Sequence, residues 1–149
     1  SRVRRETAMA DLRQAATVLR IATPGQAMVE ITREIGRWVA DQGMETGLLT
    51  VFCRHTSASL TIQENAAPAV QRDLLDWLAR MAPEDQSYAH DDEGPDDMPA
   101  HIRAMLTGVS LAVPLIGGGL ALGTWQGIYL VEHRRMPHRR DVALHLLGA

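Results

Sequence analysis

Apolar residues recur along this chain with two different periodicities, and each periodicity predicts a different kind of secondary structure. Apolar residues that recur every three or four positions predict helices over 28–39, 68–81 and 98–106. Alternating or short apolar runs predict strands over 12–22, 48–53, 60–63, 109–114, 120–122, 124–132 and 141–147. About three helices among so many short strands predict one α+β domain over residues 1–149, a compact and mostly antiparallel β-sandwich.

Local patterns refine this prediction. The segment 48–53 is apolar almost throughout, which predicts a strand buried on both faces. Asn65 is a candidate N-cap for the helix over 68–81, and Asp97 is a candidate for the helix over 98–106. The apolar residues that we expect to face inward from this last helix are Ile102, Met105 and Leu106.

Charge and composition say little about the fold, but they argue against some classes of binding partner. The formal net charge of −3 gives no reason to expect nucleic acid. The longest apolar run, 109–122, is interrupted by proline and glycine and is too short to cross a bilayer. The first seven residues lack the apolar core of a signal peptide, and the single cysteine, Cys53, suits a reducing compartment. We therefore expect a cytoplasmic protein that binds neither nucleic acid nor membrane.

An acidic segment flanked by histidines is the first candidate site. His90 and His101 enclose five carboxylates, which are Asp91, Asp92, Glu93, Asp96 and Asp97. Imidazole and carboxylate groups together suit a divalent ion such as zinc, or manganese where oxygen ligands dominate. The spacing matches no standard short zinc motif, so a solvated acidic loop is the alternative interpretation.

The second candidate site follows the strand predicted over 48–53. His55, Thr56 and Ser57 lie at its end, a position from which side chains often reach into a cleft. A serine nucleophile of the hydrolase type would need a Gly-x-Ser-x-Gly turn, and the sequence has none. We expect Thr56, Ser57 and Ser59 to hold a polar ligand or to satisfy backbone groups. His55 is expected to ligate a metal or to donate a hydrogen bond.

The remaining polar motifs each allow two interpretations. Glu64 and Asn65 precede a helix whose N-terminal amides attract anions, although Glu64 would repel a phosphate unless a metal lay between them. Trp125, which precedes Gln126, either stacks on a planar ring or packs in the core. A cluster of arginines near the C-terminus either clamps a phosphate or is merely solvated, and its members are Arg134, Arg135, Arg139 and Arg140.

Five motifs, taken in order, carry a resemblance to a known family. They are His55-Thr56-Ser57-Ala58-Ser59-Leu60, Glu64-Asn65, Tyr88-x-His90, Asp97-Met98-Pro99-x-His101-Ile102 and Leu122-Gly123-Thr124-Trp125-Gln126-Gly127-Ile128. In this order and spacing the chain, from about Gly47 to Gly148, resembles the YjbQ family, small proteins formerly of unknown function and described as secondary thiamine-phosphate synthases. Much of that family ends its penultimate strand with an acidic-Gly-Pro-Arg turn. This chain departs from that pattern and reads Glu132-His133-Arg134-Arg135 there.

The resemblance implies both an assembly and a reaction. The assembly is a homotrimer of α+β sandwiches with polar pockets near the subunit boundaries. The reaction joins hydroxymethylpyrimidine diphosphate to thiazole phosphate and releases pyrophosphate, which calls for a divalent metal, magnesium or zinc, and for groups that stabilise the departing anion. The expected partner is therefore a small phosphorylated metabolite.

On this hypothesis the candidate residues take three roles. The expected metal ligands are His55, His90, His101, Asp92 and Asp97, and Glu64 is a further carboxylate for magnesium. The expected catalytic residues are His55, His90, Glu64, Arg139 and Arg140, with either arginine standing in for the family's downstream arginine. The expected substrate-binding residues are Thr56, Ser57, Ser59, Asn65, Trp125 and Gln126, with the indole as a wall for the pyrimidine.

Two alternatives use the same residues differently. A metal-dependent hydrolase would cleave a phosphorylated metabolite with a metal-bound water as nucleophile. A non-catalytic trimer would bind a small anion or a partner protein without turnover. Release of phosphate in the absence of the thiazole substrate would distinguish the hydrolase, and ligand-induced stabilisation that survives chelation would distinguish the binding protein.

Overall fold

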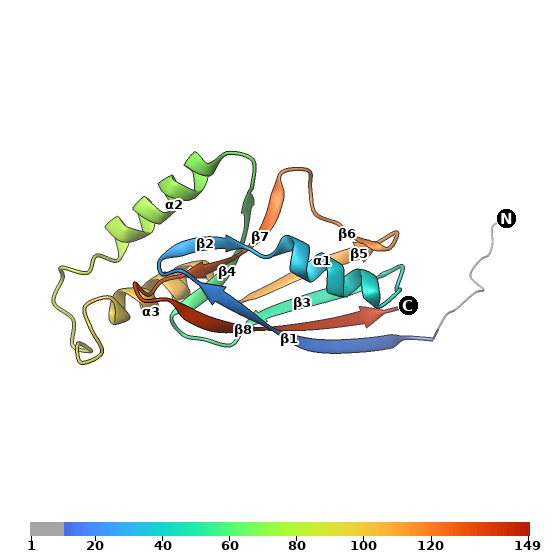
Figure 1. Ribbon diagram of the computed structural model, residues 1–149, viewed down its shortest axis with the longest axis horizontal. Coiled ribbons are helices and arrows are strands. Elements are labelled where there is room, and N and C mark those ends of the chain that lie inside the picture. The colour runs from blue at the N-terminus through green and yellow to red at the C-terminus, as the bar shows by residue number, and fades with distance from the viewer. Residues whose placement is uncertain (1–10) are drawn as a thin grey trace.

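Two antiparallel sheets that face each other form the frame of the protein, in a computed structural model that describes residues 11–149 (Figure 1). Sheet A has the strand order β1-β8-β3-β5-β6, and its strands are β1 (Arg13–Thr23), β8 (His138–Gly148), β3 (Gly47–Cys53), β5 (Ser110–Ile116) and β6 (Gly119–Leu120). Sheet B has the order β2-β7-β4, and its strands are β2 (Ala27–Glu30), β7 (Gln126–Glu132) and β4 (Ala58–Glu64). The predicted α+β class and antiparallel sandwich are confirmed.

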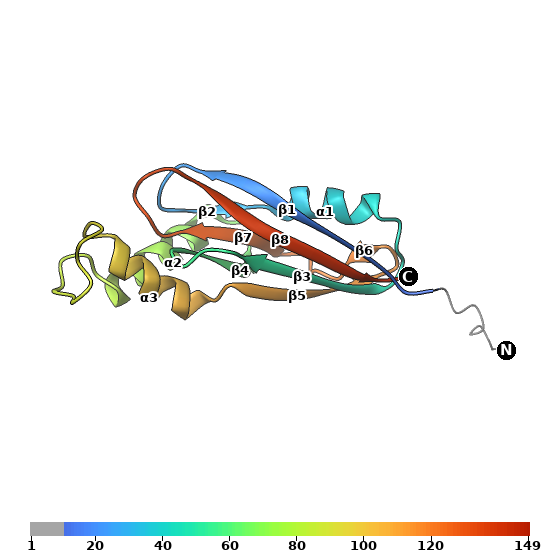
Figure 2. The ribbon, with the colours of Figure 1, turned by 90° about the horizontal axis from the view of Figure 1, so that it is seen from below.

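Three helices complete the fold, and they are α1 (Thr32–Asp41), α2 (Pro68–Met81) and α3 (Asp97–Thr107). The buried side of α1 joins the core between the sheets, whereas α2 and α3 lie against the other face of sheet B. Both views place α3, and the loop that precedes it, at the end of the sandwich opposite the C-terminus (Figure 2). None of the helices within 11–149 is long and apolar enough to span a membrane. The expectation about the first seven residues concerns a segment outside the described residues.

The core shows why β3 is not buried on both faces, as its apolar sequence predicted. Successive side chains of a strand point to opposite faces. Leu49 and Val51 point into the core and are fully buried, while Leu48 and Phe52 on the other face of sheet A are 47% and 44% exposed. No element among residues 11–149 covers that outer face at these two positions. The prediction was wrong because an apolar run alone does not reveal which face has a partner within the chain.

The helix predicted over 28–39 is in fact a strand followed by a helix. Residues Ala27–Glu30 pair with β7, with Met28 opposite Val131, and helix α1 begins only at Thr32. Met28 precedes the buried positions Ile31 and Ile35 by helical spacings, so the periodicity could not separate the two elements. Pairing with β7 determines the conformation of this segment.

Helix α3 buries a face different from the predicted one. Met105 is 77% exposed and Leu106 is 49% exposed, whereas Ala100 and Ala104 are buried. Small side chains allow α3 to lie close to β4, which explains why the alanine face is the inner one. The larger apolar residues are left on the outer side of the helix.

Both predicted N-caps are also wrong. Ala67 occupies the cap of α2, where Glu64 accepts hydrogen bonds from the amides of Ala66 and Ala67 at 2.6 and 2.8 Å. Asp96 occupies the cap position of α3, and Asp97 is the first residue of the helix. Glu64 thus serves the start of α2, and the Asp97 carboxylate is left for other contacts.

A buried ion pair joins the two sheets. Arg140 of β8 donates from Nε to Oε1 of Glu132 of β7 at 2.7 Å, and from Nη2 to Oγ of Ser57 at 3.0 Å. Thr23 of β1 donates to the same Oε1 at 2.6 Å. Glu132 is fully buried and Arg140 is 5% exposed. Burial alone would raise the pKa of Glu132, but the hydrogen bonds from Arg140 and Thr23 hold it below its ordinary value.

Replacing Arg140 tests how much the sheets depend on this pair. We expect Arg140→Met to lower the free energy of unfolding by about 3–5 kcal/mol, because it leaves the Glu132 carboxylate buried without its counter-charge. Urea denaturation measures the loss, and the double variant Arg140→Met/Glu132→Leu should recover part of it. A single variant within about 1 kcal/mol of wild type would contradict the prediction.

Candidate functional site

Two histidines converge on one buried carboxylate at the end of the molecule that carries α3. Asp97 and His101 lie one turn apart on α3, so their side chains share a face, and His90 reaches them from the preceding loop. Oδ2 of Asp97 lies 2.9 Å from Nε2 of His90 and 3.0 Å from Nε2 of His101. The hydrogen bond with Asp97 is the main cause that raises the pKa of His90 above its ordinary value.

The second contact of His101 fixes the tautomer of its ring. Nδ1 of His101 lies 2.8 Å from the carbonyl oxygen of Thr56, which can only accept, so Nδ1 carries the proton. In the neutral ring, Nε2 then presents a lone pair to the carboxylate oxygen of Asp97. Two lone pairs at that distance require a positive charge between them, either a proton or a metal ion.

The same geometry fits a divalent metal. Metal–nitrogen and metal–oxygen bonds of about 2.0–2.2 Å place neighbouring ligand atoms roughly 3 Å apart. Oδ2 of Asp97 lies at this distance from Nε2 of each histidine, and the three donor atoms all lie within 4.8 Å of one another. Ligating histidines commonly donate their other ring N–H to a backbone carbonyl, as His101 does to Thr56. The donor atoms of His90, Asp92 and Glu93 form a second, exposed grouping. Asp92 therefore lies beside His90 and outside the cluster around Asp97.

Arg134 holds Asp97 in place. It donates from Nη1 to Oδ1 of Asp97 at 2.9 Å and from Nε to Oδ2 of Asp96 at 3.0 Å, and so leaves Oδ2 of Asp97 free for the histidines. Burial would raise the pKa of Asp96, but the hydrogen bond from Arg134 keeps it below its ordinary value. The sequence showed Arg134 only as one of several clustered arginines. Arg134 lies two residues after the end of β7 at Glu132, and this position carries no local signal for a contact with Asp97.

His55 lies apart from this cluster. Its Nε2 accepts a hydrogen bond from the amide of Asp141 at 2.7 Å, so the neutral ring carries its proton on Nδ1. Burial, followed by the charge of Arg140, lowers the pKa of His55 and favours this neutral form. Among residues 11–149, no grouping of potential ligands brings His55 together with the two other histidines. Its geometry suits a hydrogen-bond donor better than a third metal ligand.

Three other predicted site residues lie inside the protein. Ser59 is fully buried and hydrogen bonded to Nε2 of His133 at 2.8 Å. Ser57 and Arg140 belong to the ion-pair network between the sheets. Thr56 is exposed and contributes its carbonyl to the cluster, while Arg139 is exposed at the start of β8.

The remaining predicted residues lie at the opposite end of sheet B. Strand β4 has seven residues from Ala58 to Glu64, which separates its ends by roughly 20 Å. At the far end Asn65 donates to Glu30 at 3.1 Å, and Gln126 accepts from the amide of Gly123 at 2.8 Å. The side chain of Trp125 is largely exposed there. Within one chain the histidine cluster around Asp97 and the polar cluster around Glu64 are therefore separate.

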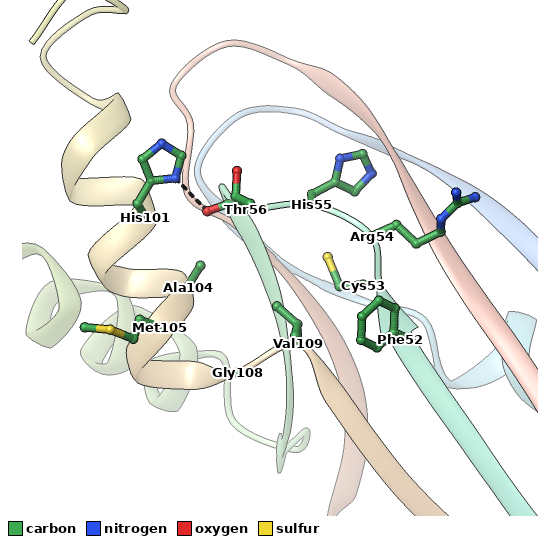
Figure 3. Close-up of a pocket in the computed structure, with 10 residues that line it drawn as sticks. All are labelled: Phe52, Cys53, Arg54, His55, Thr56, His101, Ala104, Met105, Gly108 and Val109. Atoms are coloured by element: carbon green, nitrogen blue, oxygen red, sulfur yellow. Dashed lines mark hydrogen bonds between the residues drawn. The ribbon is translucent and has the colours of Figure 1, made fainter. Parts of the chain in front are cut away.

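An open groove adjoins the histidine cluster (Figure 3). It runs between α3 and the region where β3 ends and β5 begins, and most of its lining is apolar. The lining residues are Phe52, Cys53, Arg54, His55, Thr56, His101, Ala104, Met105, Gly108 and Val109. His101 belongs both to the groove and to the cluster.

Comparison with known proteins defines the family. The model of the UPF0047 protein YjbQ-like family matches residues 17–149, which extends the resemblance to the N-terminal strand and helix. A UPF0047 protein of Synechocystis is 51% identical over 140 residues, covering 93% of this chain and 95% of that protein. The chain belongs to the YjbQ family.

Solved structures agree with this assignment. A YjbQ/UPF0047 protein of Clostridium acetobutylicum is 36% identical with a TM-score of 0.78, and the match covers 89% of this chain and 98% of that one. A YbjQ-like protein of Sulfolobus solfataricus shares the fold with a TM-score of 0.87 at 24% identity, covering 93% and 100% of the two chains.

His133, the buried partner of Ser59, predicts a pH dependence of stability. Burial lowers the pKa of His133 from 6.5 to about 4. Between these values the unfolded chain binds a proton that the folded protein does not, so stability falls as pH falls from about 6.5 to 4. The shift corresponds to roughly 3 kcal/mol. Urea denaturation across this range should show that His133→Gln flattens the profile.

His145→Gln is the matched control, because His145 lies on the outer face of sheet A and bonds only to an exposed glutamine within the described residues. The control should keep the wild-type pH profile. An equal slope in wild type and His133→Gln would contradict the assignment of this titration to His133.

Proposed function

We propose that this protein is a metal-dependent enzyme that joins hydroxymethylpyrimidine diphosphate to thiazole phosphate, a secondary thiamine-phosphate synthase. The observation that carries the proposal is the convergence of His90 and His101 on the buried oxygen of Asp97. This donor set suits a divalent cation, and a divalent cation bound there would neutralise the charge of a diphosphate. The choice of substrates comes from the family resemblance.

The reaction needs no covalent intermediate between substrate and protein. The thiazole nitrogen forms a bond to the methylene carbon of the pyrimidine substrate, and the carbon–oxygen bond to the diphosphate breaks. The electron pair leaves with pyrophosphate. Such a displacement depends on positioning the two substrates and on stabilising the departing anion.

The residues of the chain take distinct parts in this scheme. His90, Asp97 and His101 would hold the ion, and Arg134 would orient Asp97 from the opposite side. His55 would donate from Nδ1 to a substrate oxygen, because its other nitrogen is occupied by the amide of Asp141. Arg140 is committed to the ion pair with Glu132, so Arg139 is the remaining candidate of the predicted pair for contact with phosphate.

Asp97→Asn tests both the metal and the chemistry. We expect it to weaken Zn²⁺ or Mn²⁺ binding at least 100-fold by titration calorimetry, because it removes the anionic ligand shared by both histidines. Formation of thiamine phosphate, followed by chromatography, should fall in parallel. His55→Ala is the control for the metal and should bind it within about threefold of wild type.

Three outcomes would overturn parts of the proposal. Full metal binding by Asp97→Asn would exclude the cluster as the metal site. Phosphate release from the diphosphate without the thiazole substrate would favour a metal-dependent hydrolase. Metal binding without turnover of either substrate would favour a non-catalytic anion-binding protein.

We also propose that the chain assembles as a homotrimer through the outer face of sheet A. Val18, Leu48 and Leu147 are each between 43% and 48% exposed there, and Leu48 pairs with Leu147 across β3 and β8. Contiguous exposed apolar surface of this kind is typical of protein interfaces. A neighbouring subunit is also the simplest means by which the polar cluster around Glu64 would approach a histidine cluster.

Leu48→Lys tests the assembly. A charge in the middle of this face should convert the trimer to monomer at micromolar concentration, as measured by size-exclusion chromatography with light scattering. Met81→Lys is the control, since Met81 is an equally exposed apolar residue of α2, on the other side of sheet B. A wild-type monomer, or a trimer that both variants retain, would contradict the proposal.

A further inference from the structure

The groove beside the histidine cluster has an apolar floor and one polar end. Phe52, Ala104, Met105 and Val109 supply apolar surface, and His101 and His55 lie at the polar end. Figure 3 shows Ala104 on the side of α3 that faces the groove and the aromatic ring of Phe52 across from it. An apolar hollow that ends in a few polar groups is the usual form of a small-molecule site.

His101 connects this groove to the cluster. Its ring lines the groove, while its Nε2 lies 3.0 Å from the Asp97 carboxylate and its Nδ1 is held by the carbonyl of Thr56. The same residue therefore borders both the groove and the cluster. A molecule whose anionic end reaches the cluster would therefore lay its remaining body along the groove.

We propose that the groove binds the planar, weakly polar ring of a diphosphate ester whose diphosphate is held at the His90–Asp97–His101 cluster. This inference rests on the proposed function and names the binding site for the body of its substrate. Phe52 supplies the aromatic wall, since an exposed ring gains by stacking on a planar partner. Trp125, which we expected from the sequence to form the wall for the pyrimidine ring, lies at the other end of sheet B.

The polar end of the groove limits which rings would fit. Because the amide of Asp141 occupies Nε2 of His55, this histidine offers an N–H and no acceptor when neutral. The Thr56 hydroxyl is exposed beside it. A ring with an acceptor atom near its diphosphate-bearing edge satisfies these groups, whereas a long aliphatic chain would leave them without partners.

Two inert ligands separate the contribution of the ring from that of the diphosphate. Methylenediphosphonate carries the anion alone, and its benzyl ester adds an aromatic ring. Titration calorimetry with the metal-loaded protein should show that the benzyl ester binds at least tenfold more tightly than the parent. Phe52→Ala should remove most of this advantage and leave the affinity for methylenediphosphonate within twofold. Met105→Ala, which removes a second exposed apolar side chain of the groove, should also reduce this advantage.

Met81→Ala is the matched control, because Met81 is an exposed apolar residue of α2 that lies outside the groove. It should keep the advantage of the benzyl ester. Equal affinity of the two ligands for the wild-type protein, or an advantage that survives both groove variants, would overturn the proposal for the groove. Absence of binding by methylenediphosphonate itself would instead overturn the diphosphate site of the proposed function.

Discussion

The ion pair between Glu132 and Arg140 is the contact on which the arrangement of the site depends. It joins the end of β7 to the start of β8, and therefore sheet B to sheet A, in a place where neither charge reaches water. Oε2 of Glu132 also accepts the amide of Arg134, whose guanidinium holds Asp97. On the other side, Arg140 precedes Asp141, whose amide binds His55. One buried pair thus positions both the carboxylate of the cluster and the histidine of the groove.

The electrostatics of the cluster follow from this support. Arg134 neutralises one oxygen of Asp97 and directs the other toward two imidazoles, one of which has its proton committed to a backbone carbonyl. In the proposed metal site a proton and a metal ion would compete for the same position, so metal binding there would release a proton and weaken in acid. Since Asp97 is almost fully buried, its charge is little screened by solvent.

Periodicity predicted the fold class and part of the core, but it failed for several individual faces and boundaries. Alternation predicted the antiparallel sandwich, and the spacing of Ile35 and Val39 predicted the buried side of α1. The same argument failed for Phe52 of β3 and Met105 of α3, which the sequence placed inside and the structure leaves outside. His90 and His101 were nominated together because they flank one acidic segment, and the structure brings both within 3.0 Å of Asp97. Contacts between distant loops, such as Arg134 with Asp97, have no local pattern and could not be predicted.

The two ends of β4 show that a family motif need not mark chemistry. At the far end, Glu64 holds the amides that begin α2, and Asn65 binds Glu30, which joins β2 to the same corner. Gly127 lies so close that a Cβ there would be 2.5 Å from Oε2 of Glu30. These hydrogen bonds and this close packing explain why these residue types occur here, without a catalytic role. At the near end, Nε2 of His101 and Oδ2 of Asp97 lie 3.0 Å apart and need a proton or a metal ion between them, so this end of the strand is where we propose the metal site.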